Sequence, residues 1–97
     1  MKENQNISIQ YTSYSHYSEL DKAEQELLEK AVELSADAYA PYSEFNVGAA
    51  VLLKNGKIVA GSNQENAAYP SGLCAERVAL FSASANHRNE VMQTIAI

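Results

Sequence analysis

Apolar positions between residues 18 and 41 follow the repeat of an amphipathic helix. They recur at three-, four- or seven-residue steps, which places them on one helical face: Leu20, Leu27, Ala31, Leu34 and Ala38. Ser18 can cap the first turn, and Asp21 suits the positive partial charge at that end. Pro41 is expected to stop the helix, because the residue before a proline is pushed out of helical conformation.

The pattern then changes to that of a β-hairpin. Residues 45–53 predict a strand, and their nearly continuous apolar run indicates that both faces of the strand are buried. Asn55 and Gly56, flanked by two lysines, predict a two-residue hairpin turn, which makes 57–62 the antiparallel return strand. Asn, Ser, Gly and Pro are frequent in residues 63–72, so we expect a loop there.

A second helix and a third strand complete the predicted order. Residues 73–85 are helix-forming and mostly apolar, so this helix should be buried on nearly every side. Residues 91–97 have the pattern of a strand, inside which the chain stops. The order helix, hairpin, helix, strand predicts an α/β domain over residues 18–97 whose sheet is meant to continue. Residues 1–17 are polar and tyrosine-rich, and we interpret them as a loosely ordered lead-in segment.

Composition and charge narrow the classes of function. The 97 residues suit one small domain, and its net charge is −5 with no cluster of Lys or Arg. Nucleic acids and anionic membranes attract basic proteins, so we expect neither as a partner. The amino terminus lacks the apolar segment of a signal peptide, and no apolar run is long enough to cross a membrane, which favours a cytoplasmic protein. The single cysteine excludes an intrachain disulfide.

The start of the second predicted helix holds the candidate chemistry, Cys74-Ala75-Glu76. Free N–H groups and positive partial charge at the amino end of a helix favour a thiolate, which is the form of cysteine that binds zinc. Glu76 lies in the first turn, where its carboxylate can sit close to whatever the thiolate binds. Taken alone, a cysteine in an apolar helix is more often structural, so the triplet needs its wider context.

Four motifs in order supply that context. Residues 45–50 read Phe-Asn-Val-Gly-Ala-Ala, the Asn-Gly hairpin follows, residues 63–69 read Asn-Gln-Glu-Asn-Ala-Ala-Tyr, and residues 74–77 read Cys-Ala-Glu-Arg. Over residues 19–97 the chain closely resembles the amino-terminal half of the cytidine deaminase family of zinc-dependent nucleoside deaminases. The resemblance implies a three-layer α-β-α sandwich, truncated after the third strand. It also implies hydrolytic deamination of cytidine and 2′-deoxycytidine to uridine and 2′-deoxyuridine plus ammonia.

The resemblance assigns roles to the residues at the start of the second helix. In the family, zinc activates the water that attacks C4 of the pyrimidine, and a glutamate that is not a ligand shuttles the protons. On this basis Cys74 is a zinc ligand and Glu76 is the catalytic proton shuttle. Ala75 offers a backbone group to the amide edge of the ring, and Arg77 donates to the zinc thiolates and reduces their charge.

The matched residues further upstream are assigned to the substrate. Asn63 and Glu65 resemble the pair that hydrogen-bonds the ribose hydroxyls, and Phe45 resembles the aromatic residue that packs beside the pyrimidine. Ala67 and Tyr69 lie in a loop that reaches into a neighbouring subunit's site in tetrameric members. The resemblance therefore implies a free nucleoside as substrate and a homo-oligomer, a tetramer or a dimer, as the assembly. The acidic balance also favours a nucleoside over a polynucleotide.

One part of the family pattern is absent. The second zinc element, Pro-Cys-x-x-Cys, does not occur, and Cys74 is the only cysteine. His16 and His87 lie outside the matched motifs, and we interpret both as surface residues. Because a catalytic zinc needs about three protein ligands, we expect this chain alone to bind Zn²⁺ weakly or not at all. Two alternatives stay open: a deaminase of another aminonucleoside, of the blasticidin type, and an inactive fragment that keeps the fold without the metal.

Overall fold

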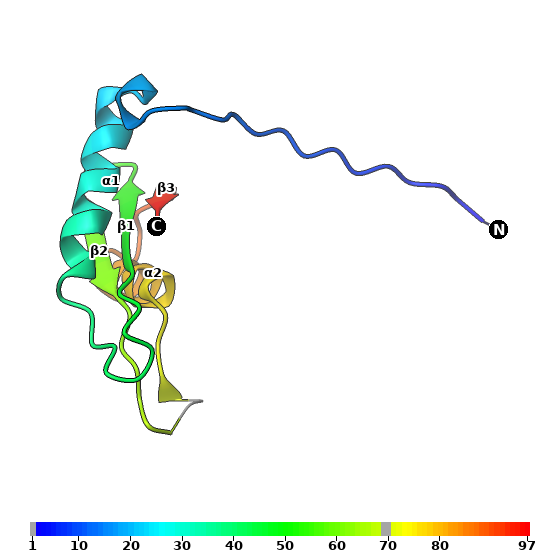
Figure 1. The fold of residues 1–97 in the computed structure, drawn as a ribbon. Coiled ribbons are helices and arrows are strands. Elements are labelled where there is room, and N and C mark those ends of the chain that lie inside the picture. Colours follow the sequence, from blue (N-terminus) through cyan, green and yellow to red (C-terminus); the bar gives the residue numbers. More distant parts are fainter. Residues whose placement is uncertain (1, 69–70) are drawn as a thin grey trace.

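Two helices cover opposite faces of one antiparallel sheet (Figure 1). The structure, a computed structural model, describes residues 2–68 and 71–97. The strand order is β2-β1-β3, so β1 is the central strand. This arrangement confirms the predicted three-layer α-β-α sandwich. The elements are, in chain order, α1 (Lys22–Ser35), β1 (Gly48–Leu53), β2 (Ile58–Ser62), α2 (Ala75–Asn86) and β3 (Met92–Ala96).

Helix α1 begins after Asp21 rather than near Ser18. The Asp21 side chain accepts a hydrogen bond from the backbone N–H of Glu24 at 2.9 Å, which satisfies one of the free donors of the first turn. Ser18 instead lies in a short 3-10 helix, η1 (Tyr17–Glu19), and its N–H donates to the ring of His16 at 3.1 Å. The prediction that Ser18 caps the long helix is therefore wrong.

The carboxyl end of α1 also differs from the prediction. The helix ends at Ser35, well before Pro41, so the proline does not stop it. Tyr39 bonds instead to the segment that follows β2: its N–H donates to the carbonyl of Asn63 at 2.9 Å, and its carbonyl accepts from the N–H of Glu65 at 2.8 Å. The chain therefore leaves the helix before Pro41 and pairs with the residues that follow β2.

Small residues let α1 lie close to the sheet. Leu27 and Ala31 are buried against Ala50 of β1, which confirms the middle of the predicted apolar face. Leu20 and Ala38, the two ends of that predicted face, lie outside the helix. A Cβ atom on Gly48 would lie 1.7 Å from the carbonyl oxygen of Ala31, so only glycine permits this approach.

The hairpin between β1 and β2 has a longer turn than predicted. Every residue of β1 except Leu52 is buried, as the continuous apolar run indicated. The N–H of Leu53 donates to the carbonyl of Lys57 at 2.9 Å, which leaves residues 54–56 as a three-residue turn. Gly56 has φ of +89°, the left-handed conformation that closes a turn of this length. The prediction of a two-residue turn is therefore wrong, although Asn55 and Gly56 correctly indicated a hairpin.

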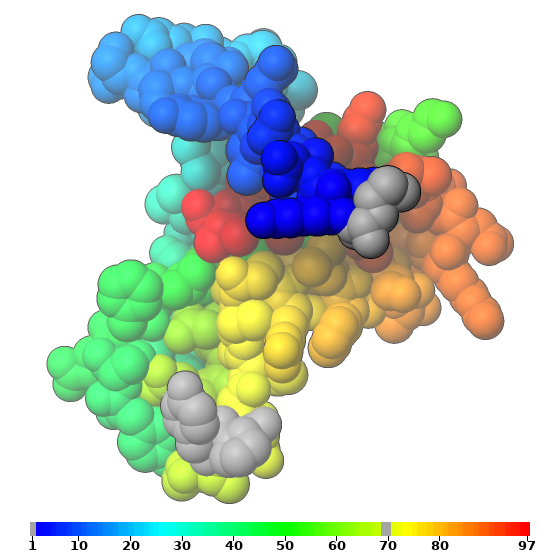
Figure 2. Space-filling model, turned by 90° about the vertical axis from the view of Figure 1, so that its right-hand side faces the viewer, coloured from blue at the N-terminus to red at the C-terminus, as the bar shows by residue number. Residues whose placement is uncertain are grey.

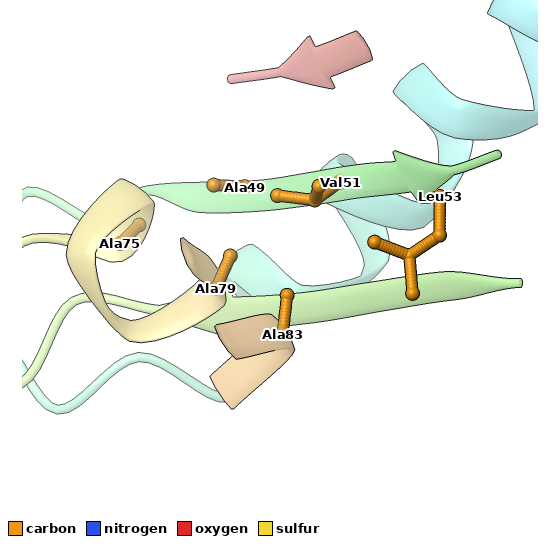
Figure 3. Close-up of a cluster of buried hydrophobic side chains, with 6 residues drawn as sticks. All are labelled: Ala49, Val51, Leu53, Ala75, Ala79 and Ala83. Carbon is orange, nitrogen blue, oxygen red and sulfur yellow. The ribbon is translucent and has the colours of Figure 1, made fainter. Parts of the chain in front are cut away.

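Helix α2 packs on the other face of the sheet through a row of alanines (Figure 3). Three of them contact the sheet side chains that point away from α1, and the buried cluster consists of Ala49, Val51, Leu53, Ala75, Ala79 and Ala83. The opposite side of α2 is open, and Phe81 is 61 % exposed. The prediction that this helix is buried on nearly every side is therefore wrong, because the chain places only one sheet face against it.

The third strand lies at an edge of the sheet. β3 pairs antiparallel with β1, with Val51 opposite Ile95, and four of its five residues are exposed. Before η1, residues 2–14 form neither helix nor strand and extend away from the domain (Figure 1). The Tyr17 hydroxyl donates to the carboxylate of Glu29 on α1, and this bond raises the pKa of Tyr17. Among the described residues, none of the helices has the length and apolar character needed to span a membrane.

Candidate functional site

Three segments enclose a cavity of about 880 Å³ beside the amino end of α2. One segment leads into β1, the second follows β2, and the third carries the first turn of α2. Figure 2 shows the face on which residues of these segments, coloured green and yellow, lie next to one another. The lining residues are Tyr42, Ser43, Val47, Asn63, Gln64, Glu65, Asn66, Ala67, Gly72, Leu73, Cys74, Ala75, Glu76 and Arg77.

The side chain of Asn63 fixes the segment that leads into β1. Its Oδ1 accepts from the N–H of Val47 at 2.8 Å, and its Nδ2 donates to the carbonyl of Phe45 at 2.9 Å. The amide therefore satisfies backbone groups that no strand partner reaches. It still has one N–H and one lone pair that these two bonds do not use.

Glu65 is bonded to the same segment, closer to Pro41. Its Oε1 accepts from the backbone N–H groups of Tyr42 at 3.0 Å and Ser43 at 3.1 Å, and its Oε2 accepts from the Ser43 hydroxyl. The Ser43 hydroxyl, followed by the backbone N–H groups of Ser43 and Tyr42, holds the pKa of Glu65 below its usual value. Glu65 is therefore an anion at neutral pH, as a charged acceptor for a ligand hydroxyl has to be.

Cys74 and Glu76 form the opposite wall. Cys74 is the residue that caps α2, but its thiol is exposed and caps no backbone N–H. Glu76 follows in the first turn, where its own backbone N–H and then the Cys74 side chain hydrogen-bond its carboxylate and lower its pKa, with a smaller contribution from Arg77. The structure thus brings together the three polar residues that the sequence analysis placed at this helix start.

The remaining predicted residues divide into those at the cavity and those away from it. Ala75 is fully buried at the base of the cavity, and Ala67 and Arg77 line it as exposed residues. Phe45 is 70 % exposed and is not part of the lining. Tyr69 lies outside the described residues.

Sequence reasoning missed Tyr42 and Ser43. Both line the cavity and both bond to Glu65, 22 or more positions further along the chain. The local signal is Ser43 itself, because serine hydroxyls in turns hydrogen-bond to nearby backbone groups. No pattern of apolar spacing indicates that this turn would contact a glutamate beyond β2.

The described residues do not complete a zinc site. Across 2–68 and 71–97, no three His, Cys, Asp or Glu side chains are grouped closely enough to hold a metal ion. Cys74 is a single donor, whereas a catalytic zinc takes about three protein ligands. The residues present therefore do not fit the metal by themselves.

The chain is similar in sequence to known proteins. Residues 21–97 match the family described as the cytidine and deoxycytidylate deaminase zinc-binding region. The chain belongs to this family. A cytidine deaminase from Halalkalibacterium halodurans is 47 % identical over 68 residues, which cover 70 % of this chain and 52 % of that protein. A cytidine deaminase from Mycobacterium tuberculosis is 52 % identical over 46 residues, covering 47 % of this chain and 35 % of that protein.

Solved structures show the same similarity in three dimensions. The crystal structure of cytidine deaminase from Burkholderia pseudomallei aligns with a TM-score of 0.61 and 53 % identity, over 62 % of this chain and 47 % of that one. The crystal structure of cytidine deaminase from Mycobacterium tuberculosis aligns with a TM-score of 0.70 and 38 % identity, over 78 % of this chain and 61 % of that one. The family and the fold predicted from the sequence are thus confirmed. The chain spans about half the length, or less, of the curated relatives it matches.

Proposed function

We propose that the protein serves in the hydrolytic deamination of cytidine and 2′-deoxycytidine, with uridine, 2′-deoxyuridine and ammonia as products. One observation carries this proposal: Cys74 and Glu76 line the same cavity as Asn63 and Glu65. A group suited to proton transfer therefore faces groups suited to binding a sugar. The relatives named cytidine deaminases support the choice of base.

In this reaction a water oxygen bonds to C4 of the pyrimidine, and the exocyclic nitrogen leaves as ammonia. Glu76 is the base and acid we assign to the proton transfers. Its lowered pKa keeps it ionised at neutral pH, so it can accept the proton of the attacking water. It gives this proton to ring nitrogen N3, then takes the proton of the new C4 hydroxyl and passes it to the amino group, which leaves as ammonia while C4 becomes a carbonyl.

For the metal, we propose that Cys74 supplies one thiolate to a zinc ion whose other ligands lie outside the described residues. Its exposure at the amino end of α2 leaves the sulfur accessible, and this helix end favours the anion. Arg77, next to Glu76 in the first turn, is the residue we expect to donate to the thiolates. A thiol that serves as a ligand has to stay reduced, which supports a cytoplasmic location.

For the substrate, we propose that Glu65 and Asn63 bind the sugar and that Ala67 and the backbone of Ala75 contact the nucleoside. Phe45 does not line the cavity, but its exposed ring is free to lie over a bound pyrimidine. We expect Tyr69, in the same loop as Ala67, to contact the nucleoside as well. The net charge of −5 supports a free nucleoside over a polynucleotide.

We also propose that the chain associates with further copies of itself, as a dimer or a tetramer. The outer side of α2, with Phe81, and the exposed β3 edge, with Ile95, present apolar side chains that nothing in the described chain covers. Exposed strand edges invite pairing with another chain. Light scattering on the purified chain tests this proposal: a discrete dimer or tetramer mass supports it, and a clean monomer at tens of micromolar contradicts it.

Nucleoside binding provides the direct test of the functional proposal. The 97-residue chain, labelled with ¹⁵N, is titrated with cytidine, with uracil as a control ligand that lacks both sugar and amino group. We expect cytidine to shift the amide signals of residues 63–67 and 72–77 in a saturable way, and uracil to shift them far less. Equal shifts with both ligands, or shifts confined to residues outside the cavity, would contradict the proposal.

A further inference from the structure

We propose that Ser43 is a positioning residue for sugar recognition: it holds the Glu65 carboxylate so that a single acceptor position is left for one ligand hydroxyl. This inference rests on the proposed function, because it takes the cavity to be a nucleoside site. Beyond that function, Ser43 is the residue that orients the sugar-binding acid, Glu65. Glu65 can then accept a hydrogen bond from one ligand hydroxyl only.

The contacts of Glu65 show how many acceptor positions of its carboxylate remain free. An ionised carboxylate offers about four lone-pair positions. Two of them, on Oε1, accept from the backbone N–H groups of Tyr42 and Ser43 at 3.0 and 3.1 Å. A third, on Oε2, accepts from the Ser43 hydroxyl. Because Glu65 lines the cavity, the one remaining position, on Oε2, is the position available to a ligand.

The Ser43 hydroxyl is itself held in one direction. Its oxygen accepts from the N–H of Phe45 at 3.1 Å, so its single proton is directed to Glu65. Glu44, which lies between Ser43 and Phe45, has φ of 58°, an uncommon left-handed conformation for a residue other than glycine. The N–H of Glu44 donates to the carbonyl of Ala40 at 3.0 Å, which fixes the turn from its other end. The turn thus presents Ser43 to Glu65 in a defined geometry.

Asn63 ties the far end of the same segment to the site. Its bonds to Phe45 and Val47 hold the backbone just past the turn. The segment is therefore attached at two points, Glu65 and Asn63, to the residues that follow β2. A carboxylate fixed in this way loses little conformational freedom when a ligand hydroxyl binds, which is how preorganisation increases affinity.

A pair of variants and a pair of ligands test the proposal on the full 97-residue chain. The ligands are cytidine and 2′,3′-dideoxycytidine, which lacks the 2′- and 3′-hydroxyls and keeps the 5′-hydroxyl. Dissociation constants come from ¹⁵N–¹H titrations of the wild type, Ser43→Ala and Ser43→Thr. We expect the wild type to bind cytidine at least about tenfold more tightly than the dideoxy compound, as a bond to a charged acceptor allows. The ratio should fall several-fold in Ser43→Ala and be retained in Ser43→Thr, which keeps the hydroxyl.

Two further variants complete the design. Ser15→Ala is the matched control, because Ser15 also donates its hydroxyl to a carboxylate, that of Glu19 at 3.0 Å, but does not line the cavity. Ser43→Cys retains the shape with a much weaker donor and serves as the test variant if Ser43→Ala does not fold. We expect Ser15→Ala to leave the ratio unchanged and Ser43→Cys to lower it.

The outcomes separate the inference from the function on which it rests. If Ser43→Ala weakens both nucleosides equally and keeps their ratio, Ser43 has only a structural role and the inference is wrong, while the nucleoside site stands. If the ratio of the two dissociation constants falls in Ser43→Thr as much as in Ser43→Ala, the hydroxyl is not the group that matters. The inference again fails. If the wild-type chain binds neither nucleoside, the proposed function fails first and the inference fails with it.

Discussion

On one side of the cavity, Asn63 and Glu65 bond through their side chains to backbone groups of residues 42–47; on the other, the thiol of Cys74 is exposed and caps no backbone N–H. The first wall is complete within the described chain, because the side chains of Asn63 and Glu65 are both hydrogen-bonded to residues 42–47. The second wall holds one thiolate donor and one acid, without a group of three metal ligands in 2–68 and 71–97. The sugar side and the metal side of the proposed site therefore depend on different parts of the protein.

The largest expected effect lies on the metal side, at Glu76. In any preparation in which this chain deaminates cytidine, Glu76→Gln should lower kcat by about 10²–10⁴-fold or more, because an amide cannot accept and return protons. Nucleoside binding should remain, since the shape of the side chain is kept. Steady-state kinetics measure the effect, and Glu33→Gln, an exposed acid on α1, is the control. A Glu76→Gln protein within about tenfold of the wild type would remove Glu76 from the proton transfers.

The next prediction concerns the metal itself. After incubation with Zn²⁺ and gel filtration, the purified chain should retain far less than one zinc per molecule, because one thiolate gives too few ligands. Elemental analysis together with the intact mass measures this ratio. Cys74→Ser is the matched variant and should change the retained zinc little. Stoichiometric zinc that disappears in Cys74→Ser would show that the chain completes the site, for instance between copies.

On the sugar side we expect a smaller effect than that of Glu76→Gln, and one on nucleoside binding instead of on kcat. Glu65→Gln should weaken cytidine binding by about tenfold or more, since a hydrogen bond to a charged group contributes about 1.5–3 kcal/mol. The change should hardly affect free cytosine, which has no sugar. Both affinities can be measured by titration, with Glu33→Gln as the control. Equal losses for cytidine and cytosine would show that Glu65 acts on the fold of the cavity and not on the sugar.

The sequence predicted the parts of the molecule that depend on local spacing. The order of elements, the burial of both faces of β1 and the place of Cys74 and Glu76 at the start of α2 all follow from apolar periodicity and ordered motifs. These features are repeated along several residues, so a single unusual residue does not obscure them.

The parts that the sequence did not predict depend on contacts between distant segments. The chain leaves α1 before Pro41, and Tyr39 bonds to residues beyond β2. Ser43 faces Glu65 because the hairpin between these two residues folds back. Phe81 was expected to be buried because the helix around it is apolar, yet only the side that carries the alanines meets the sheet. Local patterns cannot show which surfaces a sheet of given width will cover.

The smallest expected effect is on thermal stability: the contribution of Glu65, on the sugar side, should depend on pH. The pKa of Glu65 is lowered in the folded chain, mainly by the Ser43 hydroxyl, so the folded state favours the ionised form. The resulting stabilisation is fully present above the pKa that Glu65 has in the unfolded chain, about 4.3, and is lost as the pH falls through the lower folded value. Glu65→Gln lacks this ionisation. The difference in Tm between wild type and Glu65→Gln should therefore be larger at pH 7 than at pH 3.

Ser43→Ala sharpens this last measurement, because it removes the largest cause of the lowered pKa while keeping the carboxylate. Its Tm should approach that of the wild type as the pH falls from 7 to 3, as for Glu65→Gln, but over a smaller range because the two backbone donors remain. Thermal unfolding followed by circular dichroism at the two pH values measures both variants. A constant difference in Tm across this range would mean that the contacts of Glu65 do not favour its ionised form.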